Sequence, residues 1–267
     1  MRGLAALVLH SLRRRRGFLL AVCAVLFALQ IVMTLVASEL HKSGAFAQLE
    51  GLVPDFLEQW TNRVGLSFRG VVLFGHSHPI VILFLIAMAI GIGTEIALEI
   101  EMKFVDLLMA RPLRRITPVL RSVAVLLIST GAALATMLLG TWIGLTVLAP
   151  RSARVPEPQL VVSLSANLGL VVLAWGGITL AIASCSRRRA TAAASTGLLA
   201  FVMFVLDYIG RFWEKAEGVA TISPFHYYDP FGLIGGNPLP VAHVVVLGAI
   251  FVAGSILACV MYSRRDL

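Results

Sequence analysis

The chain has 267 residues, of which 58% are hydrophobic and only 13% are charged. A soluble domain of this length has no core large enough to hide so much apolar surface, so the composition excludes an ordinary soluble protein and favours an integral membrane protein. The formal net charge of +8 would suggest a nucleic-acid partner in a soluble protein, but here the basic residues stand between apolar runs, as topology determinants do, and we expect no nucleic acid.

Residues 1–16 place apolar side chains at helical spacing beside a run of four arginines at positions 13–16. This pattern predicts a short amphipathic helix lying on the membrane surface, with anionic membrane lipids holding its basic end. The apolar run at 17–38 is too long for the core of a cleaved signal peptide, which has about 7–15 residues. We therefore interpret it as an uncleaved first membrane span.

Five further stretches are long and apolar enough to cross a hydrocarbon core of about 30 Å, which takes ~20 helical residues. Their hydrophobicity is continuous rather than alternating, which favours helices over the strands of a membrane barrel. We predict an all-α, polytopic membrane protein with one transmembrane permease domain over residues 1–267. Its spans are expected near 17–38, 79–98, 119–149, 160–185, 190–212 and 241–262.

The sequence of two regions is compatible with more than one structure. The third span is overlong, and Gly131, Gly140 and Gly144 within it are compatible with close helix packing, with a tilt or with a break. The segment 39–78 mixes apolar and charged residues. We expect this outer segment to be partly helical and folded against the membrane mouth.

Basic residues predict the orientation of the chain. When the 22 lysines and arginines are assigned to alternate faces, the larger share falls on the face that carries both termini. The sharpest marker is the arginine triplet at 187–189, in a connection too short and too charged to translocate easily. By the positive-inside rule we expect a multi-pass protein of the cell inner (cytoplasmic) membrane with both termini in the cytoplasm.

The connection at 99–118, between the second and third predicted spans, combines acids, an apolar patch and a basic end. A solvated loop with positive-inside charges accounts for its arginines but not for the apolar patch at 105–109. The patch favours a docking surface for another protein, and a loop lying on the membrane is the alternative.

The order of elements resembles the ABC type-2 permease family, whose members commonly carry an acid-rich stretch and then Leu-Leu-x-x-Arg-Pro-x-x-Arg between the second and third spans. The stretches at 78–79, 223–229 and 263–267 also agree with the family pattern. Lys103 and Phe104 stand where the family often has Gly-Thr. The residues that match the central motif are Glu99, Glu101, Asp106, Leu107, Leu108, Arg111, Pro112 and Arg115.

The resemblance implies an exporter built of two permeases and two ATPases, in which 99–118 is a coupling helix seated on a cytoplasmic ABC ATPase subunit. The second permease would be another copy of this chain or a homologous one. The sequence contains no GxxxxGK[ST] phosphate loop, so we expect the chain itself to be no enzyme and to bind no cofactor. ATP and magnesium would belong to the partner ATPase.

Acidic residues within or near the spans have two interpretations. Glu95 shares a helical face with Glu99 and Asp106 if the helix is continuous, which would suit a gate or relay. We favour pairing of these acids with neighbouring arginines, because charge costs little near the headgroups. Asp207 lies one turn before Arg211, and we expect a structural ion pair between them.

His76, His78 and His226 make a copper or zinc site conceivable. Neither a carboxylate nor a cysteine nearby completes a ligand set, so we predict no metal site and no catalytic residues. Two other functions stay open. One alternative is a non-transporting membrane scaffold that recruits a cytoplasmic partner. The other is an ion-coupled secondary carrier that relies on Glu95 and Asp207.

Overall fold

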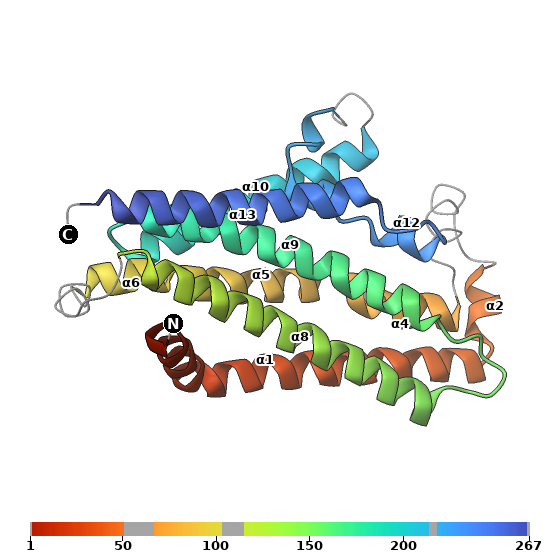
Figure 1. Ribbon diagram of the computed structural model, residues 1–267. Helices are drawn as coiled ribbons and strands as arrows, with labels where there is room; N and C mark the ends of the chain where they lie inside the picture. The colour runs from red at the N-terminus through yellow and green to blue at the C-terminus, as the bar shows by residue number, and fades with distance from the viewer. Residues whose placement is uncertain (1, 51–66, 103–114, 214–217, 266–267) are drawn as a thin grey trace.

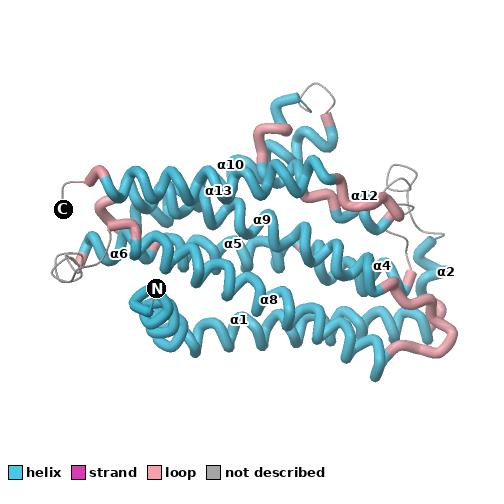
Figure 2. Tube along the Cα trace, in the orientation of Figure 1, coloured by secondary structure: helices cyan, strands magenta, loops and turns pink. Residues whose placement is uncertain are grey.

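Helices form every regular element in the part of the chain that the computed structural model describes, namely residues 2–50, 67–102, 115–213 and 218–265. Figure 2 shows these helices and the described loops between them, with no strand among the described residues. The all-α prediction is confirmed for this part of the chain. The elements are α1 (Arg2–Lys42), α2 (Ala45–Glu50), α4 (Phe68–Ser77), α5 (Pro79–Gly93), α6 (Glu95–Glu101), α8 (Thr117–Leu148), α9 (Pro158–Cys185), α10 (Arg189–Phe212), η1 (Pro224–Tyr227), α12 (Pro230–Ile234) and α13 (Val241–Ser263).

Six helical stretches among the described residues are long and apolar enough to cross a membrane, as the hydropathy of the sequence predicts. Five of them are the single helices α1, α8, α9, α10 and α13. The other runs from Phe68 to Glu101 and consists of α4, α5 and α6 placed end to end. Each predicted span overlaps one of these six stretches.

The second stretch begins earlier than the predicted start at Pro79. Ser67 caps α4 by accepting a hydrogen bond from the backbone N–H of Gly70 at 3.2 Å, so helix already begins within the predicted outer segment. Pro79 has no N–H and starts a new helix, α5. His78 caps that helix, because its Nδ1 accepts from the N–H of Ile80. The expectation of partly helical structure in 39–78 is confirmed for its described residues.

The first helix also differs from its predicted boundaries. Residues 2–42 form one helix, and no helix end separates residues 1–16 from the span at 17–38. The first turns of α1 angle away from the rest of the helix (Figure 1, dark red). A position of these turns on a membrane surface stays a prediction.

The overlong third span is a single unbroken helix, α8. Two of its three glycines press against α1. A Cβ atom at Gly140 would lie 2.8 Å from the carbonyl oxygen of Phe27, and one at Gly144 would lie 2.7 Å from Thr34 Oγ1. Gly131 faces open space. Close packing, rather than a break, is therefore the structural use of Gly140 and Gly144.

The long helices lie side by side along a common direction (Figure 1). α1 packs along α8, α9 packs along α13, and α5 lies against α9 in the interior. At the crossing of α9 and α13, a Cβ atom on Gly254 would lie 2.5 Å from the carbonyl carbon of Gly177. The core around this crossing includes the fully buried Trp175 and Leu85. Most of α10 and α13 stays exposed, as lipid-facing helices require.

Both termini lie at one end of the bundle, which we call the termini end (Figure 1). α6, the beginning of α8, the α9–α10 connection and the end of α13 gather there. The other end carries α2, α4 and α12, and we call it the opposite end. The six long stretches of the described chain run alternately in opposite directions along the bundle, which explains why the two termini share an end.

Candidate functional site

The short helix α6 at the termini end ties three different elements together through its three acids. Glu95 Oε2 lies 3.2 Å from Nη2 of Arg15 in α1. Glu99 Oε1 accepts from Nη1 of Arg121 in α8. Glu101 Oε2 accepts from the backbone N–H of Arg189, the first residue of α10, at 2.9 Å. α6 is also the last described element before residues 103–114.

Helical spacing explains how one short helix reaches so many partners. Glu95 and Glu99 are four residues apart and share a face that looks into the bundle, whereas Glu101 lies off that face. The pair of Glu99 and Arg121 is well buried, with the side chains 13% and 6% exposed. Breaking a buried ion pair by removing one partner costs roughly 3–5 kcal/mol, since the other charge is left in a poorly solvated site. These contacts therefore hold α6 firmly in place.

A break in the helix at Thr94 precedes this acidic helix. Thr94 separates α5 from α6, and the carbonyl oxygen of Gly91 near the end of α5 accepts from two arginines. Nη1 of Arg15 donates at 3.1 Å and Nη2 of Arg189 at 3.4 Å. Positive charge is favourable here, because the last carbonyls of a helix carry partial negative charge.

The structure confirms that Glu95 and Glu99 pair with arginines. It also identifies the partners, Arg15 and Arg121, which the sequence analysis did not name. The signal for Arg121 was its place as a lone charge just inside an apolar run. Of the other predicted coupling residues, Arg115 donates from Nη1 to the carbonyl of Ser263 at 3.4 Å. The remaining coupling residues lie outside the described part of the chain, namely Asp106, Leu107, Leu108 and Arg111.

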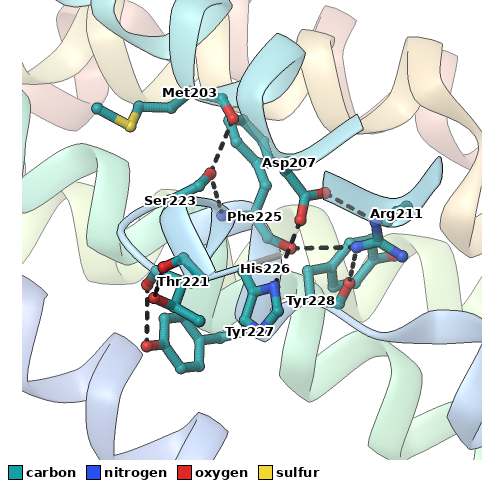
Figure 3. A network of polar contacts seen from close by, with 10 residues as sticks. Met203, Asp207, Arg211, Thr221, Ser223, Phe225, His226, Tyr227 and Tyr228 are labelled. Carbon is teal, nitrogen blue, oxygen red and sulfur yellow. Dashed lines mark hydrogen bonds and ion pairs between the residues drawn. The ribbon is translucent and has the colours of Figure 1, made fainter. Parts of the chain in front are cut away.

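A second charged network lies between α10 and the loop before α13 (Figure 3). Nε of Arg211 donates to Asp207 Oδ2 at 2.8 Å, which confirms the predicted ion pair. Nη2 of Arg211 also donates to the carbonyls of Tyr228, at 3.0 Å, and Phe225, at 3.4 Å. His226 Nδ1 lies 3.8 Å from the other oxygen of Asp207. The network fastens the loop onto α10.

Tyr228 connects the loop before α13 to α4. Its hydroxyl donates to the carbonyl of His76 in α4 at 3.0 Å. Burial raises the pKa of the Tyr228 hydroxyl, although the positive charge of Arg211 acts in the opposite direction. The hydroxyl therefore keeps its proton and its hydrogen bond at neutral pH. These bonds give the Asp207 network a structural task, which is to join α4, α10 and the loop.

The interior holds polar side chains, of which the sequence analysis named His76 but neither Gln30 nor Asn167. Gln30, midway along α1, donates from Nε2 to the carbonyl of Gly75 at 3.0 Å and accepts from Thr141 of α8 at 3.3 Å. It thereby links α1, α4 and α8. The side chains of His76 and Asn167 are fully buried, and their ring nitrogens and amide atoms have no hydrogen-bond partner. A glutamine inside an apolar run was the available signal.

The histidines considered for a metal have other surroundings. His76 is buried within the bundle, while His78 caps α5 and meets the ring of Phe74 edge-on. His226 belongs to the Asp207 network at a different place. Within the described residues, no group of three histidine, cysteine, aspartate or glutamate side chains is arranged to hold a metal ion.

Comparisons of the chain with protein-family models, with curated proteins and with solved structures find no match. The three-way attachment of α6 is the feature that best distinguishes this bundle from an inert set of apolar helices.

Proposed function

We propose that this chain is the transmembrane permease subunit of an ATP-driven ABC transporter, an exporter in which a separate cytoplasmic ATPase subunit supplies the energy. One observation carries the proposal. α6 leads directly into the segment whose residues resemble a coupling helix. The three acids of α6 bind to residues of α1, of α8 and of the start of α10. A pull on that segment would therefore reach three helices of the bundle at once.

The connection through α6 would work as a lever. Thr94, where α5 ends and α6 begins, would be the point at which α6 moves against α5. Glu95 would then carry the movement to Arg15, and Glu99 would carry it to Arg121. Buried ion pairs suit this task, because separating the two charges would leave each of them uncompensated in a poorly solvated site.

The rival functions explain these contacts less well. A scaffold that only recruits a partner needs a docking segment but has no use for rigid links from that segment into the bundle. An ion-coupled carrier would need acids that bind and release the transported ion. Glu95 and Asp207 are instead both held by arginines.

The division of labour with an ATPase gives a direct test. The purified chain alone should neither bind nor hydrolyse ATP above background, because its sequence contains no phosphate loop. The complex with the co-expressed ATPase should hydrolyse ATP with magnesium. The measurement is nucleotide binding by equilibrium dialysis together with phosphate release. Saturable, magnesium-dependent ATP binding by the isolated chain would remove the basis of the permease assignment.

The proposed topology places the termini end in the cytoplasm. Single cysteines in a background that lacks Cys23, Cys185 and Cys259 test this placement. Ser186→Cys and Ser263→Cys, at the termini end, should react with an impermeant thiol reagent only after the cells are permeabilised. Asn237→Cys at the opposite end is exposed and should react in intact cells. Labelling of Ser186→Cys from outside intact cells would overturn the orientation.

A further inference from the structure

Three arginine-rich segments that are far apart in the sequence meet at the termini end. Arg15 of α1 and Arg189 at the start of α10 donate to the same carbonyl oxygen, that of Gly91, at 3.1 and 3.4 Å. Arg265, after α13, donates from Nη1 to the carbonyl oxygens of Ser184 and Ser186 at 2.9 and 3.0 Å. Those carbonyls directly precede the arginine triplet at 187–189. The fold thus brings three basic stretches of the chain together at one end of the bundle.

Each segment turns one arginine inward and leaves the others exposed. The inward arginines, Arg15, Arg189 and Arg265, bond to backbone carbonyls of neighbouring helices. The exposed ones form what we call the arginine patch, which consists of Arg13, Arg14, Arg16, Arg187, Arg188 and Arg264.

Among the described residues, the three acids of α6 at the termini end are already engaged. Glu95 faces Arg15, Glu99 faces Arg121, and Glu101 accepts from the backbone of Arg189. Within the described part of the chain, the arginine patch therefore carries an excess of positive charge. Such an excess at the surface attracts anions from its surroundings.

The surroundings of the patch point to a lipid. Arg187, Arg188 and Arg264 lie next to the ends of long apolar helices, and Arg13, Arg14 and Arg16 lie in α1 just before its apolar run. Directly after Arg16, α1 exposes Phe18 and Leu20, which are 48% and 68% accessible. Cationic groups beside exposed apolar side chains match an anionic phospholipid, whose phosphate lies at headgroup level and whose acyl chains lie below it.

We propose that the arginine patch binds the headgroup of an anionic phospholipid and prefers one that carries two phosphodiesters, such as cardiolipin. Guanidinium groups bind phosphate oxygens in a planar, bidentate manner. Arginines contributed by three segments offer more donors than a single phosphate accepts. A lipid with two linked phosphates bridges α1 and the α9–α10 connection, and so clamps these helices at the termini end.

The test compares lipid binding by the full chain and by matched variants in phosphatidylcholine nanodiscs that contain a titrated fraction of cardiolipin. Arg187→Gln with Arg188→Gln should weaken cardiolipin binding about 30-fold, since each basic residue near an anionic headgroup contributes about 1 kcal/mol. Arg151→Gln with Arg154→Gln removes the same charge from exposed positions at the opposite end. This control should bind cardiolipin as the wild type does.

Further arms identify the ligand. Inorganic pyrophosphate should not displace the lipid, and phosphatidylglycerol, at an equal phosphate concentration, should bind more weakly than cardiolipin. Equal loss of binding in the patch and control variants, displacement by pyrophosphate, or equal binding of phosphatidylglycerol would each overturn the proposal. If the first variant does not elute as a folded species, Arg13→Gln with Arg14→Gln provides the same comparison from α1.

Discussion

Glu99→Ala is expected to destabilise the protein by about 3–5 kcal/mol, because it leaves the buried guanidinium of Arg121 without its acid. For a chain of this size such a loss lowers the unfolding midpoint on the order of 10 °C. Thermal unfolding of the detergent-solubilised chain, followed by circular dichroism or by size-exclusion profile, measures the effect.

An exposed ion pair in the same chain gives the matched control. Glu39 and Lys42 are paired at 2.9 Å, but their side chains are 63% and 57% exposed. Glu39→Ala should therefore change stability by less than about 1 kcal/mol, as surface pairs do. If Glu99→Ala is no more harmful than Glu39→Ala, the attachment of α6 to α8 contributes nothing and the proposed lever fails.

A double variant separates stability from coupling. Glu99→Met with Arg121→Met replaces the buried charges by apolar side chains, a change that is often neutral or stabilising. We expect this protein to fold and to assemble with the ATPase at wild-type yield, while ATP hydrolysis by the complex loses its coupling to transport. Full coupling in the double variant would show that packing alone transmits the movement and that the ion pair is dispensable.

Leu107→Ala with Leu108→Ala is expected to abolish coupled ATP hydrolysis and to reduce co-purification of the ATPase, with membrane insertion intact. Both residues lie outside the described part of the chain, and the prediction rests on their place in the sequence directly after the acids of α6. Truncating a buried anchor of an interface costs at least ~2 kcal/mol, a factor of about 30 in affinity. The yield of ATPase after affinity purification of the permease measures the loss.

The same double change in the segment at 39–78, Leu49→Ala with Leu52→Ala, serves as the control and should leave ATPase association unaffected. A normal ATPase yield together with normal transport in the Leu107 and Leu108 variant would mean that the coupling segment is misplaced. The scaffold and carrier hypotheses would then regain support.

The sequence by itself determined the helical class and the six apolar stretches. A membrane-spanning helix is a local property, since ~20 consecutive apolar residues satisfy their own backbone hydrogen bonds and need no partner to be recognised. The ion pair of Asp207 and Arg211 was equally predictable, because one helical turn brings residues four apart together. The sequence also predicted that the acids Glu95 and Glu99 pair with arginines.

Only the tertiary structure decided which arginines those are. Arg15 pairs with Glu95 although the two residues are 80 positions apart in the chain. Arg15 and Arg189 both donate to the carbonyl oxygen of Gly91. Likewise, the glycines of α8 were compatible with close packing, with a tilt or with a break. The contact of α1 with Gly140 and Gly144 shows that close packing is their role. Sequence periodicity predicts which side chains lie on the same face of one helix. The partner of each side chain depends on how separate helices pack against each other. This packing is set by long-range contacts, which no local sequence pattern encodes.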